Sequence, residues 1–390
     1  MRVAIDVDVV RFPLTGIGRY AYELVRHLAS AESGIELDLF AGPRRIAAPP
    51  SAEVAARASG TGRHGIGVVD WLSRQSLVVG VHRAAIDAAQ GLVLRRHPPD
   101  LFHGPRFYLP RFDGPRVVTI HDLSMFVWPQ CHPAGRLPTV RRAVERAVAE
   151  GVHVLTGSEF VRREMIDRYG LPEKRVSAVP LACGEEFRPR DSFATGEVLR
   201  RHGLTHDGYC LYSGTIEPRK NLHTLISAYE ALPDDMRQRW PLVLCGYYGW
   251  NSDDVHRRID RAARAGWLRY LGYVAADELP VLFAGARLFA FPSLYEGFGL
   301  PVLEAMASGV PVVCSNSASL PEVVGDAGLM IDAQDVEGLR AALSRALVDE
   351  DWREWARSQG LARASGYSWA RCAGQTAAVY RQIVGVGNGA

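Results

Sequence analysis

No apolar run in the 390-residue sequence approaches the ~20 residues that a membrane-spanning helix needs. The amino terminus, MRVAIDVDVV, alternates like a strand and lacks the basic and apolar segments of a secretory signal. The formal net charge is only +2, which is too small for a protein that binds nucleic acid through an extended basic surface. We therefore expect a globular protein without a nucleic-acid partner, for which any membrane contact is peripheral.

The sequence also lacks paired cysteines and metal-ligand spacing. No His, Cys or carboxylate cluster has the spacing of a zinc or calcium site. The six cysteines occur singly, several of them in strand-like runs such as PLVLCG and VPVVCSN. These features predict buried reduced thiols, a cytoplasmic location and neither a metal nor another cofactor. The cysteines are Cys131, Cys183, Cys210, Cys245, Cys314 and Cys372.

Strand and helix signals alternate along most of the chain. The length suits about two domains of 150–200 residues with a cleft between them. Short apolar runs separated by segments of helical period predict a parallel, doubly wound α/β sheet in each half. The predicted strands are 2–8, 35–42, 100–104, 116–122, 152–158, 175–181, 209–215, 241–246, 268–274, 287–293, 310–316 and 328–332.

Two regions interrupt this alternation. Between Pro43 and Pro99 the sequence is rich in Ala, Arg and His and has poor strand signals, so we expect helices plus a mobile loop. The polar stretch 184–208 is predicted to be the linker between the domains. After Asp335 the chain is predicted to be mostly helical.

The stretch LYEGFGLPVLEAMASG places two carboxylates, Glu296 and Glu304, in an apolar setting after a predicted strand. Ligands of open α/β sheets bind at the carboxyl ends of strands, where glycine turns expose backbone amides and helix amino termini attract anions. Pro301 suits the first position of the following helix. Amides for phosphate beside carboxylates for hydroxyl groups indicate a nucleotide-sugar site. The alternative is that Glu304 complements the helix dipole and Glu296 is a solvated turn residue.

A second strand end carries cations. In SGTIEPRKN, Arg219 and Lys220 stand where the next helix would begin, and paired cations beside amides suit a diphosphate that develops charge as it leaves. Surface Arg-Lys pairs are common, so this motif is weak alone. In HDLS, His121 follows another strand and could either face a ligand or be a satisfied core residue, with Asp122 orienting its ring.

Two amino-terminal motifs invite other functions. Gly16 begins GIGRYA, which matches G-x-G-x-x-A with Asp38 about 20 residues later, as in NAD-binding proteins. The strand ends too early for that tight turn, so we interpret the segment as a glycine loop that closes over a phosphate or sugar. The pair Asp6 and Asp8 resembles a D-x-D metal motif, but it lies in the first strand of another fold type. We interpret Asp6 as an acceptor contact and not as a metal ligand.

Together these segments resemble the retaining glycosyltransferases of family 4, whose GT-B fold has two Rossmann-like domains facing each other across a cleft. The resemblance covers essentially the whole chain, through the glycine loop, HDLS, GSEFVRREM, SGTIEPRKN and, most specifically, the glutamate pair within EGFGLPVLEAMASGVPVV. It implies an acceptor-binding domain over 1–187 and a donor-binding domain over 188–368. It also implies that the last helix, about 369–390, packs back on the first domain.

The resemblance assigns roles to individual residues. Glu304 is expected to bind the ribose and Glu296 the transferred sugar, while Arg219 and Lys220 hold the diphosphate. His121 is expected to face the reacting sugar, with Asp6 and Asp122 on the acceptor side. The remaining expected donor-binding positions are Gly16, Gly214, Thr215, Tyr273, Val274, Gly297, Phe298, Gly299 and Leu300.

The implied reaction is metal-independent, and the departing phosphate deprotonates the acceptor. HDLSMFVWPQCHP and the EGFG region look most like bacterial mannosyl- and rhamnosyltransferases that build O-antigen or exopolysaccharide on a polyprenyl-diphosphate carrier from GDP-sugars. The Arg-bearing segments 92–100 and 138–148 could then contact the anionic inner membrane from the cytoplasm, or be solvated helix faces. The alternatives are a UDP-, ADP- or dTDP-sugar donor, an NAD-dependent oxidoreductase, and a nucleotide-sugar hydrolase or epimerase.

Overall fold

The chain folds into two compact α/β units. A computed structural model describes residues 1–12, 14, 16–30, 34–50 and 76–387, with the backbone only for 76–84 and 386–387. One unit comprises residues 1–181 and 369–390, and the other comprises residues 182–368. The loop predicted within 43–99 falls largely outside the described residues. In the part of the chain that is described, no helix is both long enough and apolar enough to cross a membrane.

The second unit is built on a six-stranded, wholly parallel sheet in the order β10-β9-β8-β11-β12-β13. All six strands predicted for this half are confirmed. The four central strands are buried along their whole length, as a sheet covered by helices on each side requires, whereas the edge strands β10 and β13 are only partly buried. The strands are β8 (Cys210–Ser213), β9 (Leu242–Cys245), β10 (Leu268–Gly272), β11 (Leu288–Phe291), β12 (Val312–Ser315) and β13 (Leu329–Ile331).

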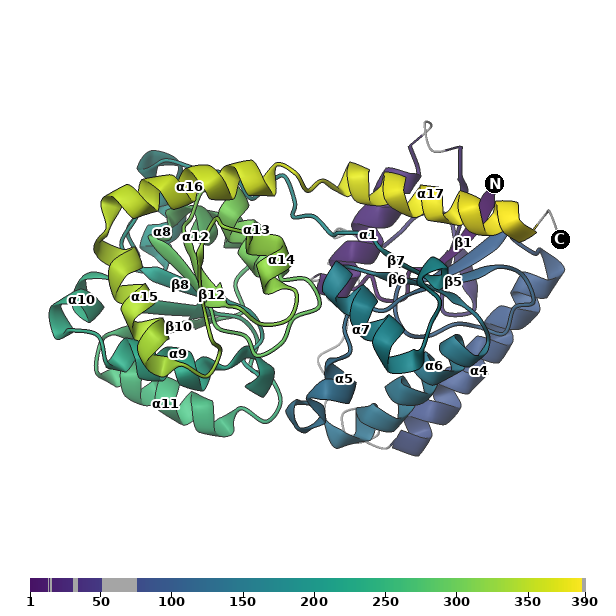
Figure 1. Cartoon of the computed structure of the whole chain (residues 1–390), viewed down its shortest axis with the longest axis horizontal. Coiled ribbons are helices and arrows are strands. Elements are labelled where there is room, and N and C mark those ends of the chain that lie inside the picture. The colour runs from purple at the N-terminus through teal and green to yellow at the C-terminus, as the bar shows by residue number, and fades with distance from the viewer. Residues whose placement is uncertain (13, 15, 31–33, 51–75, 388–390) are drawn as a thin grey trace. The chain divides into compact units, whose positions relative to one another are not determined.

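The strand order of this sheet reverses between β8 and β11. Since crossovers between parallel strands are right-handed, the reversal sends the connecting helices to opposite faces. In Figure 1, α8, α12 and α13 cover one face, and α9, α11 and α15 cover the other. The helices are α8 (Ser192–Arg201), α9 (Leu222–Glu230), α10 (Asp234–Arg239), α11 (Asp253–Arg264), α12 (Leu279–Gly285), α13 (Leu300–Ala307), α14 (Leu320–Val324), α15 (Val336–Val348) and α16 (Glu350–Ala364).

The predicted linker 184–208 is wrong in part, because it contains α8. Asp191 begins this helix and accepts a hydrogen bond from the Ala194 N–H at 2.8 Å. The polar residue Asp191, which contributed to the prediction of a linker, is thus the N-cap of a helix. The boundary between the units falls at 181/182, whereas the sequence suggested 187/188.

The first unit has a seven-stranded sheet in the order β3-β2-β1-β4-β5-β6-β7. Its six predicted strands are confirmed, but β3 is an additional antiparallel edge strand in the region judged poor in strand signals. Because β3 has only three residues and two of them are Arg, it has no apolar pattern from which a strand could be predicted. The strands are β1 (Arg2–Asp6), β2 (Glu36–Ala41), β3 (Arg44–Ile46), β4 (Leu101–Gly104), β5 (Arg116–Thr119), β6 (His153–Thr156) and β7 (Val176–Ala178).

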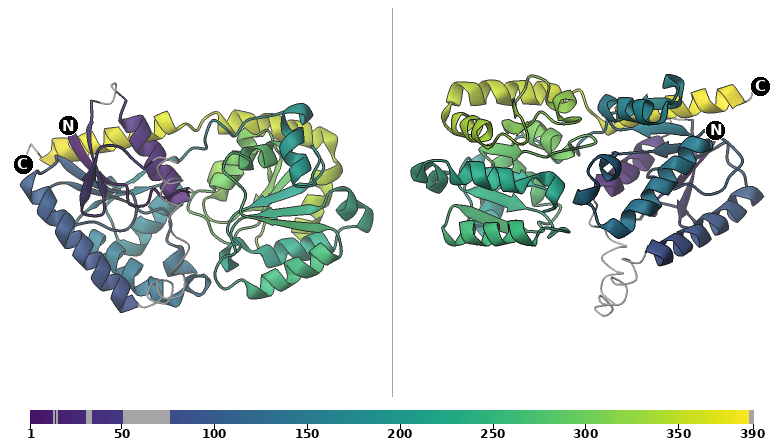
Figure 2. Two further views of the ribbon diagram at one scale, coloured as in Figure 1. Left: turned by 180° about the vertical axis from the view of Figure 1, so that it is seen from behind. Right: turned by 60° about the horizontal axis from the view of Figure 1, so that its bottom comes forward.

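The carboxy-terminal helix returns to the first unit. It lies alongside the first helix of the chain (Figure 1 and, from behind, Figure 2), and the remaining helices of the unit gather on the other side of the sheet. The helices are α1 (Gly16–Leu28), α4 (Ser76–Arg96), α5 (Ser124–Val127), α6 (Leu137–Ala149), α7 (Glu159–Tyr169) and α17 (Trp369–Gly387). Residues at both ends of the sequence therefore build one core.

A close backbone approach at the carboxyl ends of β8 and β9 requires glycine. Gly246 has φ +143°, and a Cβ there would stand 1.9 Å from the Gly214 carbonyl oxygen. We predict that Gly246→Ala lowers the free energy of unfolding by about 2–4 kcal/mol, because backbone atoms must separate. Gly374→Ala is the matched control, since a Cβ at this helical position meets nothing within 4 Å. It should be neutral or stabilise by up to about 1 kcal/mol. Urea titration of both variants measures the difference, and equal stabilities would refute the close approach.

Candidate active site

Two loops meet where the strand order of the second unit reverses. One follows β8 and contains the 3₁₀ helix Pro218–Lys220, and the other follows β11 and leads into α13. The Leu294 N–H donates to the Arg219 carbonyl at 2.9 Å, which ties the loops together. The sequence placed Arg219 and Lys220 where the next helix would begin. They lie in the 3₁₀ helix directly before α9, which itself begins at Leu222.

Both predicted cations contact the predicted carboxylate. Lys220 Nζ lies 2.5 Å from Glu296 Oε1, and Arg219 Nη1 lies 3.2 Å from Glu296 Oε2. Arg219 Nη1 also donates to the Tyr295 carbonyl at 2.6 Å. The Glu296 residue is only 8% exposed, so its charge is desolvated and must be balanced by these partners. The structure thus brings together three residues that the sequence had placed on two separate motifs.

The charges in this cluster depend on one another. Burial alone would raise the pKa of Glu296, but Lys220 and Arg219 outweigh it and lower that pKa to about 2. Burial lowers the pKa of Lys220, and Glu296 opposes this effect. The Lys220 ammonium also lies 5.1 Å from the centre of the Phe291 ring. Glu296 is therefore an ionised carboxylate with hydrogen-bond acceptors to offer, and neither an acid nor a base near neutral pH.

Sequence reasoning missed a second buried carboxylate, Glu217. Its Oε1 lies 3.0 Å from Arg219 Nη2, and its Oε2 accepts the Arg219 N–H at 3.1 Å. Burial raises its pKa, although Arg219 and Lys220 oppose the shift. The cluster of Glu217, Arg219, Lys220 and Glu296 is formally neutral when all four groups are ionised. The signal available in the sequence was the Pro after Glu217, because Pro is common at the first position of a helical turn.

Asn221, also missed, fixes the carboxyl edge of the sheet. It adopts the left-handed conformation at φ +58°, which Asn tolerates better than most residues. Its Nδ2 donates to the Pro292 carbonyl at 3.0 Å and to the Ala333 carbonyl at 2.6 Å. These carbonyls follow β11 and β13. One side chain therefore joins three loops and holds Lys220, its neighbour, at the edge.

The glycine loop before α13 is closely packed. Gly299 has φ +106°, and a Cβ there would stand 2.6 Å from Leu320 Cδ2, so another residue would be strained. The Ser319 hydroxyl donates to the Glu296 carbonyl at 2.9 Å. Helix α13 begins at Leu300, so Pro301 takes its second position and not the predicted first. Gly297 and Phe298 of this loop are buried, and Leu300 is half-buried.

Glu304 lies one turn into α13 and is 8% exposed. Burial, with a smaller contribution from the Glu304 charge, raises the pKa of the Cys245 thiol to about 12. Cys245 is the last residue of β9, so the Glu304 carboxylate lies near the carboxyl ends of the strands. The alternative of a solvated turn residue is wrong for Glu296, and Glu304 is buried as well.

Aromatic side chains border the same edge beyond β9 and β10. The rings of Tyr247 and Tyr273 stack with centroids 4.8 Å apart, and both side chains stay exposed, by 43% and 47%. Val274 is buried, whereas Gly214 and Thr215 after β8 are half-buried. The predicted donor-binding residues of this unit therefore follow β8, β10 and β11 at one sheet edge.

In the first unit, His121 follows β5 and is half-buried. Its Nε2 lies 2.9 Å from the Pro105 carbonyl, and because a carbonyl only accepts, Nε2 carries the proton. Burial lowers the pKa of His121 although Pro105 and Asp122 oppose the shift, so the ring is neutral and Nδ1 is an acceptor. Asp122, which was predicted to orient this ring, acts on it through its charge. Its carboxylate accepts from the Ser124 N–H at 2.9 Å and the Ser124 hydroxyl at 2.5 Å.

Asp6 and Asp8 do not form a pair on one strand face, because β1 ends at Asp6. Asp6 is buried and accepts the Asp8 N–H at 3.0 Å, while Asp8 pairs with Arg106 at 2.8 Å. Burial alone would raise the pKa of Asp8, but Arg106 and Arg11 outweigh it and lower that pKa. Among the described residues, no three His, Cys, Asp or Glu side chains are placed to hold a metal ion.

The acidic residue that the NAD-binding alternative requires is already paired within the protein. Asp38 is buried and pairs with Arg45 of β3 at 2.5 Å, so it is engaged by the strand that the sequence did not reveal. Gly16 begins α1 and is exposed. The cysteines are free, and all except the half-buried Cys183 are buried, which confirms the predicted thiols.

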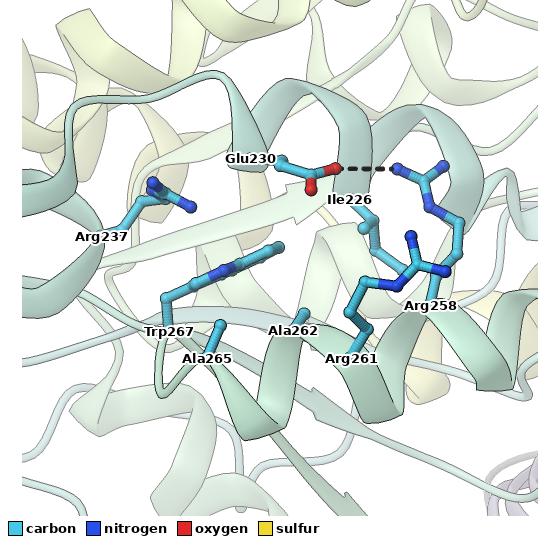
Figure 3. Close-up of a pocket in the computed structure, with 8 residues that line it drawn as sticks. All are labelled: Ile226, Glu230, Arg237, Arg258, Arg261, Ala262, Ala265 and Trp267. Atoms are coloured by element: carbon cyan, nitrogen blue, oxygen red, sulfur yellow. Dashed lines mark hydrogen bonds and ion pairs between the residues drawn. The ribbon is translucent and has the colours of Figure 1, made fainter.

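A pocket elsewhere in the second unit has a different character. Figure 3 shows it between α9, α10 and α11, with Glu230 and Arg258 paired at 3.3 Å. Trp267 precedes β10, which places this pocket at the amino ends of the strands, opposite the loops described above. The polar and aromatic residues that line it are Glu230, Arg237, Arg258, Arg261 and Trp267.

Comparisons with known proteins agree with this geometry. Residues 14–183 match the model "Glycosyltransferase Family 4", and residues 199–362 match "Glycosyl transferases group 1". The chain is 43% identical to O-antigen chain mannosyltransferase B of Escherichia coli, over 98% of this chain and 100% of that protein. It is 36% identical over 55% of its length to the serotype-specific mannosyltransferase WbdA of Escherichia coli, of which the match covers 27%.

Solved structures share the fold at low identity. Sucrose-phosphate synthase from Thermosynechococcus elongatus superposes with a TM-score of 0.73 at 19% identity, covering 99% of this chain and 100% of that one. The chain thus has the GT-B fold, with a Rossmann-like sheet in each unit that is parallel apart from the edge strand β3. The chain belongs to the family 4 glycosyltransferases and is a glycosyltransferase.

Proposed function

We propose that this glycosyltransferase moves mannose, or a related 6-deoxyhexose, from a GDP-sugar to the saccharide of a lipid-linked cell-surface polysaccharide, with retention of configuration. The observation that carries the proposal is the buried cluster of Arg219, Lys220 and Glu296 at the strand reversal. It offers cations to a diphosphate and a carboxylate to sugar hydroxyls at one place. The printed name of the Escherichia coli relative supports mannose and O-antigen.

Donor binding, in this proposal, exchanges the partners inside the cluster. The diphosphate takes the Lys220 and Arg219 donors that Glu296 holds in the free protein at 2.5 and 3.2 Å. The Glu296 oxygens then accept from hydroxyl groups of the sugar, and Glu304 accepts from the ribose. Tyr273 and Val274 border the base, while Gly214, Thr215 and the amides around Gly297 approach the phosphates.

The proposed chemical step balances without a protein nucleophile. The bond between the sugar C1 and the phosphate oxygen breaks, and a bond from C1 to the acceptor oxygen forms on the same face. The acceptor proton passes to the departing phosphate oxygen. Arg219 and Lys220 stabilise the charge that develops on that phosphate. His121, neutral with a free Nδ1 acceptor in its tautomer, accepts a hydrogen bond from a hydroxyl of the reacting sugar.

Membrane contact of the first unit is a weaker part of the proposal. Two arginines of the segment 138–148 bind backbone carbonyls, Arg141 that of Met125 at 3.0 Å and Arg146 that of Leu109. Arg95 and Arg96 in the last turn of α4 are exposed instead. We propose that this end of α4 meets anionic lipid headgroups.

The nucleotide is tested by thermal shift against GDP, UDP, ADP, dTDP and NAD, followed by product analysis with sugars of the stabilising nucleotide. We expect GDP to raise the melting temperature most, and GDP-mannose to yield an α-linked product. Stabilisation by UDP, ADP or dTDP would overturn the GDP assignment and keep the glycosyltransferase. Stabilisation by NAD alone would overturn the whole site.

Lys220 offers a direct spectroscopic test, because the sequence contains only two lysines, Lys174 and Lys220. Protein with ¹³C-labelled lysine gives two ε-methylene signals, which Lys174→Arg assigns. We predict that GDP shifts the Lys220 signal, since its ammonium exchanges Glu296 for phosphate, and leaves the exposed Lys174 unchanged. A Lys220 signal that stays fixed at saturating nucleotide would place the diphosphate elsewhere.

Variants separate binding from turnover. We predict that Glu304→Ala raises the donor Kd about 10- to 100-fold, because the ribose hydroxyl groups lose their hydrogen bonds to a charged acceptor. Lys220→Ala and Arg219→Ala should mainly lower kcat, by about 10²–10³ for each lost charge-stabilising donor. Glu337→Ala, at an exposed glutamate of α15, is the control and should change neither quantity. Calorimetry and rate assays measure both, and unchanged values in all three site variants would disprove the site.

Chelation tests the metal-independent step. Since Arg219 and Lys220 supply the positive charge that the departing diphosphate needs, we predict that excess EDTA changes kcat by less than about twofold. A rate that falls tenfold or more with EDTA, and recovers with Mg²⁺ or Mn²⁺, would contradict the proposed role of the two cations.

A further inference from the structure

A chain of buried hydrogen bonds crosses the first unit from its carboxy-terminal helix to its first helix. The Tyr380 hydroxyl lies 2.6 Å from His103 Nδ1, and His103 Nε2 lies 2.8 Å from Thr119 Oγ1. Thr119 Oγ1 lies 3.0 Å from the Tyr20 hydroxyl. The four residues come from α17, β4, β5 and α1, and each is at most 2% exposed.

The protonation of this chain follows from burial. Burial, with His121 adding a smaller effect, lowers the pKa of His103 to about 3, so the imidazole is neutral with one N–H and one lone pair. Burial raises the pKa of Tyr20 and of Tyr380, so both phenols keep their protons. The phenol is a stronger acid than the threonine hydroxyl, which favours donation from Tyr380 to Nδ1 and from Nε2–H to Thr119. Thr119 Oγ1 then accepts from Nε2–H, and either hydroxyl can donate in its contact with Tyr20, so all three contacts are satisfied.

The end of this chain touches His121. The Tyr20 ring meets the His121 ring edge to face, with centroids 5.0 Å apart and planes at 82°. On another side, His121 donates to the carbonyl of Pro105, which follows β4 directly after Gly104. The His121 ring is therefore fixed by a ring from α1 and a carbonyl after β4. The hydrogen-bond chain connects both of these elements to Thr119, the last residue of β5, two residues before His121.

Stability alone does not explain such a network. A buried polar group that loses its partner destabilises the fold, whereas an apolar set of the same shape can be equally stable. What a fully satisfied network adds is a single fixed geometry. The group next to it that gains from fixed geometry is His121, because its Nδ1 lone pair points in one direction only when its ring does.

We propose that Tyr380, His103, Thr119 and Tyr20 are positioning residues that fix the ring plane and tautomer of His121. The inference rests on the proposed contact between His121 and the transferred sugar. It makes the carboxy-terminal helix part of the apparatus that orients this contact, although Tyr380 lies 277 residues from His103 in the sequence.

A matched pair of substitutions at Thr119 tests the proposal. Thr119→Val keeps the shape and removes the hydroxyl, while Thr119→Ser keeps the hydroxyl and removes a methyl group. We expect Thr119→Val to lower kcat about 10- to 100-fold, as small misplacements of a reacting group do, with the donor KM changed less than about threefold. Thr119→Ser should stay within about twofold of the unmodified protein. Tyr380→Phe removes one oxygen at the far end and should resemble Thr119→Val.

A second measurement reads His121 itself and needs no turnover. Protein labelled with ¹⁵N-histidine, with His121 assigned through His121→Asn, should show the Nε2–H tautomer in the unmodified protein and in Thr119→Ser. In Thr119→Val and Tyr380→Phe the signals should move toward a mixture of tautomers. Unchanged His121 signals in both variants would overturn the proposal, whichever donor the enzyme uses. Equal losses in Thr119→Ser and Thr119→Val would also overturn it, in favour of packing.

These outcomes are separable from failure of the proposed function. If the GDP-sugar assay shows no turnover by the unmodified protein, the ¹⁵N signals still report whether the network fixes the ring. If the ring is fixed by the network but kcat is insensitive to it, the contact between His121 and sugar is wrong. Circular dichroism establishes that each variant is folded, and Tyr380→Phe carries the test if Thr119→Val is not.

Discussion

The carboxylate of Glu296 has to be ionised and buried at once, and the second unit is arranged around that requirement. An isolated charge in this position would be prohibitive, so Lys220 and Arg219 must come to it from another strand. The reversal of strand order between β8 and β11 brings these two strand ends together and leaves room beside them. Asn221 and the Leu294 N–H then hold the two loops at that distance. The strand order of the sheet thus determines where the partners of Glu296 can be placed.

The first unit solves a different problem with neutral groups. Around His103 burial is complete, so the imidazole stays uncharged and its partners are hydroxyl groups instead of ions. A network of neutral groups fixes the orientation of its members through directional hydrogen bonds and adds no net charge. That suits a site where a sugar hydroxyl is to be oriented, while the charged cluster of the second unit suits a diphosphate. The division between charged and neutral polar groups follows the division of labour proposed for the two units.

Much of this arrangement was predictable because it is local or periodic. Among the described residues, apolar runs predicted twelve of the thirteen strands, and the rule that ligands bind at strand carboxyl ends selected Arg219, Lys220, Glu296 and Glu304. What was not predictable depends on contacts between distant residues. The pairing of Lys220 with Glu296 spans 76 positions, and that of Tyr380 with His103 spans 277. β3 and α8 were missed for another reason, since short polar elements carry no periodic signal.

The formal neutrality of the ion cluster has a consequence for the reaction proposed here. A nucleoside diphosphate without its sugar would take Lys220 and Arg219 from Glu296, yet bring no hydroxyl groups to satisfy the buried carboxylate in return. The complete donor brings a diphosphate for the two cations and sugar hydroxyl groups for Glu296. Binding of the donor is therefore favoured over binding of the leaving nucleotide by the cost of leaving Glu296 unpartnered. In this proposal the sugar departs with the acceptor, and Glu296 then competes with the diphosphate for Lys220 and Arg219, which favours product release. The same buried carboxylate would thereby distinguish the donor from the leaving nucleotide.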